Sequence, residues 1–295
     1  MVDISVLRAV RNFKNISQSQ LQEIKTSIEI TNDPEIKKNL IFHLFLNQLK
    51  CEKRFFCDHE FFNILKENFE RYTIEINEEK TLYRARRTND VEFNERRTQL
   101  FEIDYWLGSD DTSLDTIMFQ GFDKRGSFVP EHIYPNRANT SSISVLYCAD
   151  SLNTAISEVR PFKSTVVSVA SIKLNKTPLK LFNLTYPEEL KNKAYSFIYN
   201  IEHPYWHNIL SNLFSIPHEH SNNDEYLATQ CISEYIRLSG KFDGIIYESS
   251  LDDEGNNIVL FNCKHDDYSI CEPINSNIYI IEKFNIRYKD MVKGS

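Results

Sequence analysis

Three residues of types that are common in active sites stand close together in the middle of this 295-residue chain, namely Arg137, Tyr147 and Glu158. An arginine can hold an anionic group through paired hydrogen bonds, and a tyrosine combines an apolar ring with a polar hydroxyl. A carboxylate can stabilise positive charge that develops in a transition state. This stretch of the sequence is therefore where we predict an active site.

The sequence around these residues predicts a strand, a tight turn and a helix. Apolar residues alternate with period two over 143–149 and then recur three or four residues apart over 152–159, which are the periods of a strand and of a helix. One short strand-then-helix unit would therefore carry both the tyrosine and the glutamate.

The residues that flank the predicted helix mark its ends. Asp150 or Ser151 can cap its first turn. Pro161 ends the helix, because proline cannot continue the hydrogen-bond ladder and restricts the residue before it. Glu158 then lies in the last turn, where the negative pole of the helix dipole is mildly unfavourable for a purely structural glutamate. A nearby cation such as Arg137 would compensate for this charge.

Short motifs on both sides of this unit follow one another in a recognisable order. From the N-terminus they are Leu82-Tyr83-Arg84-Ala85-Arg86, Asn136-Arg137-Ala138-Asn139, Leu146-Tyr147-Cys148-Ala149, Thr154-Ala155-Ile156-Ser157-Glu158-Val159-Arg160-Pro161, Thr229-Gln230-Cys231-Ile232-Ser233-Glu234-Tyr235-Ile236, Asp243-Gly244-Ile245-Ile246-Tyr247-Glu248-Ser249-Ser250 and Asn257-Ile258-Val259-Leu260-Phe261. In this order they resemble the RES domain, the toxin component of bacterial RES and Xre toxin–antitoxin modules.

The resemblance implies an α+β fold similar to that of ADP-ribosyltransferases, with a mixed sheet and flanking helices, and an activity that destroys NAD+. The family's arginine, tyrosine and glutamate fall on Arg137, Tyr147 and Glu158 with no gap. Its serine falls on Ser249, with the adjacent Ser250 as the alternative. In such a cleft the arginine contacts the diphosphate and aromatic rings lie on the nicotinamide side. The residues implied to bind NAD+ in this domain are Arg137, Tyr147, Ser249 and Ser250.

The loop around Arg137 departs from the family pattern. The family usually has glycine before the arginine and Pro-x-Gly after the asparagine, whereas Asn136, Thr140 and Ser142 stand in those places here. Because glycine reaches backbone conformations that other residues rarely adopt, we expect this loop to have a different shape.

Two further arginines, Arg84 and Arg86, lie in a strand predicted over 80–86. Alternation along the strand places both side chains on the same side, where they could form part of a diphosphate clamp. The alternative is a solvated, arginine-rich face that continues to Arg97.

Under the resemblance, Glu158 carries the chemistry. Cleavage of the bond between nicotinamide and ribose passes through an oxocarbenium-like state, and a carboxylate near the ribose can hold its hydroxyls and stabilise the developing charge. A structural alternative stays open for each of the residues. These alternatives are an ion pair between Glu158 and Arg160, a surface salt bridge for Arg137, core packing for Tyr147, and turn chemistry for Ser249 and Ser250.

Composition excludes several classes of function. The chain has 34 Lys and Arg against 42 Asp and Glu, a formal charge of −8, so we expect neither a nucleic-acid nor a membrane partner. None of its 7 glycines stands in a G-x-G-x-x-G or G-x-x-x-x-G-K pattern, which excludes a Rossmann turn and a P-loop. NAD+ would therefore be bound in another way, as a substrate, and no cofactor is expected.

The cysteines and the first residues favour a reducing cytoplasm. The 6 cysteines have no paired spacing, and no charged-then-apolar signal segment leads the chain. No window of about 18 residues is uninterruptedly apolar. Cys51, Cys57 and His59 resemble part of a zinc site, but their spacing and the lack of a second ligand pair predict no metal.

The sequence predicts two units, a helical N-terminal unit over 1–76 and a RES domain over 77–295. Helical periodicity in the first unit covers Ile4–Phe13, Ser17–Ile28, Asp33–Lys50 and His59–Tyr72. In the second, a long polar segment that ends at Pro135 is interpreted as a functional flap. The remaining predicted strands are Thr165–Leu174, Gly244–Tyr247, Asn257–Phe261 and Ile278–Ile286, and the remaining helices are Pro187–Tyr199 and Asp224–Leu238.

Taken together, these features predict an enzyme that consumes NAD+ and releases nicotinamide, with water or phosphate as the acceptor. By family analogy it would be a growth-inhibiting toxin or defence effector held by a cognate antitoxin protein. Two alternatives stay open, an ADP-ribosyltransferase that modifies a protein or nucleic acid, and a catalytically inactive nucleotide-binding module. Homo-oligomerisation is also left open.

Overall fold

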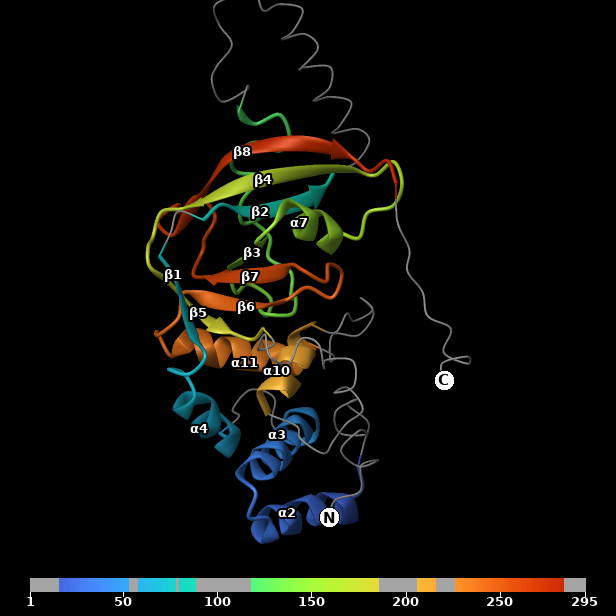
Figure 1. The fold of residues 1–295 in the computed structure, drawn as a ribbon, viewed down its shortest axis with the longest axis vertical. Helices are drawn as coiled ribbons and strands as arrows, with labels where there is room; N and C mark the ends of the chain where they lie inside the picture. Colours follow the sequence, from blue (N-terminus) through green and yellow to red (C-terminus); the bar gives the residue numbers. More distant parts are fainter. Residues whose placement is uncertain are drawn as a thin grey trace, which may run out of the picture.

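The computed structural model describes residues 16–52, 58–77, 80–88, 118–185, 206–215 and 226–283, and for 206–209 it describes the backbone alone. These residues form an eight-stranded sheet with helices stacked beyond one of its edges (Figure 1). The predicted fold class is confirmed, since the protein has a mixed sheet with flanking helices that follows a helical N-terminal unit.

Each described N-terminal helix begins at a residue whose side chain caps it. These helices are α2 (Gln18–Ile30), α3 (Pro34–Cys51) and α4 (Glu60–Glu67). Ser17 forms a capping box with Gln20 at the start of α2. Asp33 accepts hydrogen bonds from two backbone N–H groups at the start of α3, and His59 caps α4. The predicted helix Ile4–Phe13 lies outside the described residues.

The predicted helix His59–Tyr72 is too long. The helix ends at Glu67, and the chain turns into the strand β1 (Thr73–Ile76). The β-branched residues of Thr-Ile-Glu-Ile favour an extended backbone. Their antiparallel pairing with β5 then stabilises this segment as a strand.

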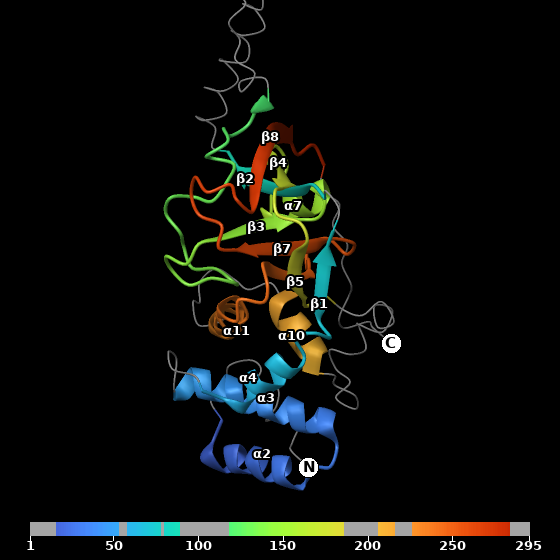
Figure 2. The same ribbon diagram turned by 90° about the vertical axis from the view of Figure 1, so that its left-hand side faces the viewer.

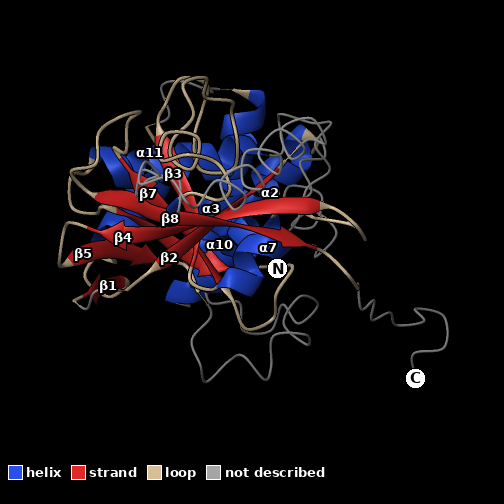
Figure 3. Cartoon of the chain, turned by 90° about the horizontal axis from the view of Figure 1, so that it is seen from above, coloured by secondary structure: helices blue, strands red, loops and turns tan. Residues whose placement is uncertain are grey.

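The strands of the sheet follow the order β1-β5-β6-β7-β3-β2-β4-β8. After β1 they are β2 (Leu82–Arg87), β3 (Val145–Ala149), β4 (Val166–Leu174), β5 (Leu179–Asn183), β6 (Gly244–Glu248), β7 (Asn256–Phe261) and β8 (Cys271–Ile280). Neighbouring strands are antiparallel except for the parallel pair β5 and β6. Viewed from above, successive strands are rotated relative to one another, which is the usual twist of a sheet (Figure 3).

Alternation along the strands divides the sheet into two faces. On β3, Tyr147 and Ala149 point to one face, and Leu146 and Cys148 point to the other. We call the first the helix face, because helices pack on its side of the sheet. They are α7 (Leu152–Glu158), α10 (Trp206–Ser215) and α11 (Leu227–Leu238). We call the second the loop face, because segments near residues 128 and 268 cover it.

The helical unit and the sheet share one hydrophobic core. A single cluster of buried side chains runs from Phe45 on α3 through Ile232 on α11 to Ile245 on β6. Figure 2 shows the corresponding order in space, with α10 and α11 between the sheet and the N-terminal helices. The division at residue 76 stays a prediction, and the strand β1 on its N-terminal side pairs with β5 inside the sheet.

Two further differences separate the sequence interpretation from the structure. The last strand of the described residues is Cys271–Ile280, earlier than the predicted Ile278–Ile286, whose end lies outside the described residues. Sequence periodicity also missed β5 and α10. The helix predicted over Pro187–Tyr199 and most of the predicted flap lie outside the described residues.

Candidate active site

A cavity of about 320 Å³ opens on the helix face of the sheet. The helix α7 packs over β2, β3 and β4, whereas α10 packs against β6. The side chains of Tyr83, Ala149, Asn257 and Tyr247 are cross-strand neighbours on that face, from β2 across β3 and β7 to β6, and all four line the cavity. The predicted residues Arg137, Tyr147 and Glu158 line it as well.

The turn before α7 fixes where this helix begins. Ser151 caps the helix by accepting a hydrogen bond from the backbone N–H of Thr154, which decides between the two predicted caps. Asp150 instead accepts hydrogen bonds from the backbone N–H and the side-chain amide of Asn256. A Cβ atom on Gly255 would lie 1.9 Å from Oγ1 of Thr154, so the turn that precedes β7 can approach α7 this closely only with glycine.

The other end of α7 lies beside the cavity. Glu158 lies in the last turn, as predicted, and is the last residue of the helix. Arg160 has a φ of 46°, which is uncommon for a non-glycine residue. Arg87 on β2 donates hydrogen bonds to the carbonyl groups of Val159 and Arg160. A cation therefore does compensate the negative pole of the helix, but it is Arg87, where the sequence had suggested Arg137.

Two side chains hold the carboxylate of Glu158. The hydroxyl of Ser249 donates to Oε1 over 2.6 Å, and Nδ2 of Asn257 donates to the same oxygen over 2.7 Å. Within the described part of the chain Glu158 forms no ion pair with Arg160, so the structural alternative for this glutamate is not supported. Ser249 is buried beneath the glutamate, while Ser250 lines the cavity directly.

Arg137 lies at the tip of a tight hairpin. Asn136 and Asn139 exchange backbone hydrogen bonds across this turn. The hydroxyl of Tyr147 accepts from the backbone N–H of Ala138 over 2.9 Å and donates to Oδ1 of Asn139 over 2.8 Å. Paired backbone bonds and a tyrosine therefore shape the loop in which the family pattern has glycines.

Two aromatic rings flank the guanidinium of Arg137. Its Cζ atom lies 5.7 Å from the ring centre of Tyr226 and 5.8 Å from that of Tyr247, within the range of cation–π attraction. Burial raises the pKa of Tyr247 to about 12, although the nearby Arg137 partly opposes the shift. Burial likewise raises the pKa of Tyr147 well above its usual value. Both phenols are therefore neutral near pH 7 and act as hydrogen-bonding or packing groups.

Arg84 and Arg86 occupy the same side of β2, as alternation predicts, but this side is the loop face. Arg84 donates to the carbonyl groups of Ser127 and Phe128, and Arg86 donates to that of Gly126. Arg84 borders the cavity, yet its guanidinium is directed away from Glu158, and burial lowers its pKa to about 10. These two arginines fasten a loop, and the predicted diphosphate clamp is not supported.

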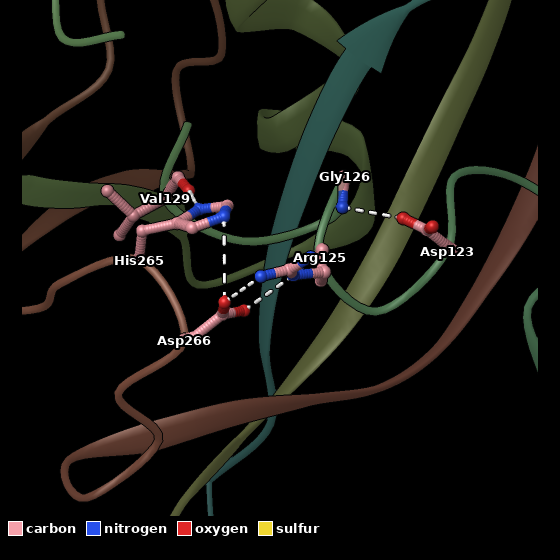
Figure 4. A network of polar contacts seen from close by, with 6 residues as sticks. All are labelled: Asp123, Arg125, Gly126, Val129, His265 and Asp266. Carbon is pink, nitrogen blue, oxygen red and sulfur yellow. Dashed lines mark hydrogen bonds and ion pairs between the residues drawn. The ribbon is translucent and has the colours of Figure 1, made fainter. Parts of the chain in front are cut away.

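The same loop is fastened again at its outer end (Figure 4). Arg125 and Asp266 form a bidentate ion pair, with 2.8 Å between Nε and Oδ1. Nδ1 of His265 lies 2.8 Å from the carbonyl oxygen of Val129. Arg125, Asp266 and His265 thus help to hold this loop in place.

Comparison with known families agrees with this geometry. The model of the RES domain matches residues 118–279, more than half of the chain. The chain belongs to the RES domain family. Neither a curated protein nor a solved structure shows significant similarity to it. At the level of the family, membership points to an enzyme that acts on NAD+.

The RES domain brings the predicted site residues together and adds two that sequence reasoning missed. Arg137, Tyr147 and Glu158 share one cavity, and Ser249 contacts the glutamate. Sequence reasoning assigned no role to Asn257 or to Tyr226, which reach the site from β7 and from the start of α11. The family motifs contain Asn257, but nothing in its spacing shows that it meets Glu158.

The requirements of a membrane span and of a metal site are not met among the described residues. None of their helices combines the length and the hydropathy that a membrane span requires. They also contain no cluster of three or more His, Cys, Asp or Glu side chains that could hold a metal ion.

Proposed function

We propose that this RES domain consumes NAD+ by cleaving the bond between nicotinamide and ribose. The observation that carries the proposal is the state of Glu158 in the cavity. One of its oxygens, Oε1, accepts two hydrogen bonds from the protein, and Oε2 has no hydrogen-bond partner among the described residues. A carboxylate held in this way can use its second oxygen on a substrate.

The chemistry requires a positioned negative charge. As the bond to nicotinamide breaks, its electron pair leaves with the nicotinamide, and the ribose acquires oxocarbenium character. Glu158 would hold a ribose hydroxyl and stabilise this positive charge. Water then adds to the ribose and loses a proton, which yields ADP-ribose. Phosphate in place of water would yield the 1-phosphate of ADP-ribose.

The remaining residues of the cavity suit the binding of a dinucleotide. Arg137 can hold the diphosphate, since an arginine pairs well with phosphate oxygens. The rings of Tyr226 and Tyr247 stand beside it and offer apolar surfaces to a planar group. The cavity volume of about 320 Å³ lies at the lower end of the range for ligand pockets.

A toxic role follows from this activity, because loss of NAD+ stops growth. We propose that the protein is a growth-inhibiting toxin or defence effector of the cytoplasm, and that a cognate antitoxin protein holds it inactive. Arrest of growth on expression, with loss of cellular NAD+, is the expected result. Normal growth with abundant folded protein would contradict the toxic role but not the reaction.

The test is incubation of the purified chain with NAD+ that carries a label on the adenosine. We expect nicotinamide release with or without a metal chelator, because the bond cleavage needs only a positioned carboxylate. Separate reactions with and without phosphate identify the acceptor from the labelled product. Label on a protein or nucleic acid would indicate an ADP-ribosyltransferase, and intact NAD+ after long incubation would indicate an inactive binding module.

A further inference from the structure

Asn257 is a buried side chain of the cavity to which the sequence assigned no role. It lies on β7, is 7% exposed and donates from Nδ2 to Oε1 of Glu158 over 2.7 Å. The two residues are 99 positions apart in the chain. An amide that meets a carboxylate must present its N–H group, because an ionised carboxylate only accepts hydrogen bonds.

The strand register explains how this amide reaches the glutamate. Asn257 lies between Ala149 on β3 and Tyr247 on β6 in the row of cross-strand neighbours. Glu158 is the last residue of α7, and Ala149, Asn257 and Glu158 all line the cavity. The amide of Asn257 meets the carboxylate of Glu158 there.

Two donors on one oxygen define the orientation of the carboxylate. Asn257 approaches from the middle of the sheet, and Ser249 approaches from the turn after β6. Rotation of the carboxylate would break both hydrogen bonds, which are of the stronger, charge-assisted kind. The second oxygen, Oε2, stays without a partner in the part of the chain that the structure describes.

We propose that Asn257 is a positioning residue for Glu158. Together with Ser249 it holds Oε1, so that Oε2 faces the ribose of the substrate. The part of this inference that concerns the ribose rests on the proposed function. The contact between Asn257 and Glu158 does not, and it can be tested without a substrate.

The neighbouring residue supplies a matched control. Asn256 also donates from its side-chain amide to a carboxylate, that of Asp150, over 2.8 Å. It does not line the cavity. If Asn257 had only a structural role in this strand, its replacement should therefore affect kcat no more than the replacement of Asn256 does.

The first test compares the kinetics of Asn257→Ala with those of Asn256→Ala. We expect Asn257→Ala to lower kcat for NAD+ cleavage about 10- to 100-fold, because the carboxylate loses its fixed orientation, and to leave KM nearly unchanged. Asn256→Ala should keep the kcat of the wild type. Equal kcat in the wild type and Asn257→Ala would overturn the inference.

The second test exchanges donor and acceptor and measures thermal unfolding. Asn257→Asp has the same shape but sets two carboxylates against each other. We expect its Tm to fall by about 2–4 °C at pH 8 and to recover as the pH drops towards 5, when a shared proton restores a hydrogen bond. Adding Glu158→Gln should restore the Tm at pH 8, because an amide again faces a carboxylate. This double variant should still fail to cleave NAD+, since its carboxylate now lies at position 257 and no longer at position 158.

The two tests separate the possible failures. A wild-type chain that leaves NAD+ intact contradicts the proposed function, while recovery of the Tm in the double variant still supports the contact. If the changes in Tm at the two positions simply add up, the residues do not interact, and the inference fails even in an active enzyme.

Discussion

The two ends of the cavity hold their charged groups in different ways. At the glutamate end, Ser249 and Asn257 donate directly to the carboxylate of Glu158. At the arginine end, the rings of Tyr226 and Tyr247 flank the guanidinium of Arg137. Hydrogen bonds from Tyr147 hold the hairpin behind that arginine.

Each end of the cavity is suited to a different task. Hydrogen bonds to a carboxylate oxygen are directional and fix its position within a few tenths of an ångström. Contacts between a cation and a ring depend much less on direction, and a planar guanidinium pairs well with the oxygens of a diphosphate. We therefore expect changes at the glutamate end to slow the reaction, and changes at the arginine end to weaken binding.

The largest effect is expected for Glu158→Gln. The amide keeps the shape of the side chain but loses the charge that stabilises a cationic ribose, and loss of one such electrostatic partner costs on the order of 100-fold or more in kcat. Turnover of NAD+ by the folded variant, followed by nicotinamide release, is the measurement. Toxicity on expression should disappear with it.

A matched control is Glu234→Gln on α11, whose carboxylate pairs with Arg237 at 2.9 Å outside the cavity. It should keep full turnover, with a stability change within about 1 kcal/mol. Near wild-type turnover by Glu158→Gln would remove the catalytic role of the glutamate, and with it the contrast between the two ends.

A smaller effect of a different kind is expected for Arg137→Ala. A diphosphate contact is made equally in the ground and transition states, so its loss should raise KM by roughly 10-fold and change kcat little. Steady-state kinetics with NAD+ measure both constants. Arg125→Ala, which removes a surface arginine of the loop face, is the control and should leave both unchanged. A fall in kcat at constant KM would assign Arg137 to the chemistry.

An indirect and weaker effect on binding is expected for Tyr147→Phe. The change leaves the buried N–H of Ala138 without its acceptor, which costs about 1–3 kcal/mol in the free energy of unfolding. The hairpin should loosen, and KM should rise less than in Arg137→Ala. Urea unfolding and steady-state kinetics test the two parts. Tyr268→Phe on the loop face serves as the control, and an unchanged stability of Tyr147→Phe would show that the hydroxyl does not hold the hairpin.

The arginine end also shows what sequence can and cannot predict. Period-two and helical patterns found β3 and α7, and the stop signal at Pro161 placed Glu158 in the last turn of that helix. These features depend on neighbours in the chain, which a sequence displays. The alternation of apolar residues also predicts that Tyr147 is buried. Its hydrogen bonds to Ala138 and Asn139 could not be predicted, because they depend on how the loop that carries these two residues folds.

Contacts that depend on how distant strands pair could not be predicted from the sequence. Asn257 meets Glu158 only because β7 pairs with β3 in a particular register. The same limit applies to Arg84 and Arg86. Alternation predicts that they share a side of β2, but the rest of the sheet decides which side faces the cavity.

The smallest effect is expected for Tyr247→Phe and concerns alkaline pH. Burial raises the pKa of Tyr247 from 10.0 to about 12 in the folded protein, so the unfolded chain loses this proton first. Its contribution to stability is complete below pH 10.0 and is lost as the pH rises towards about 12. Tyr247→Phe should therefore show a shallower fall in the free energy of unfolding over this window, while the exposed Tyr134→Phe should follow the wild type. Identical slopes in all three proteins would mean that Tyr247 reaches water, and that the arginine end is more open than its rings suggest.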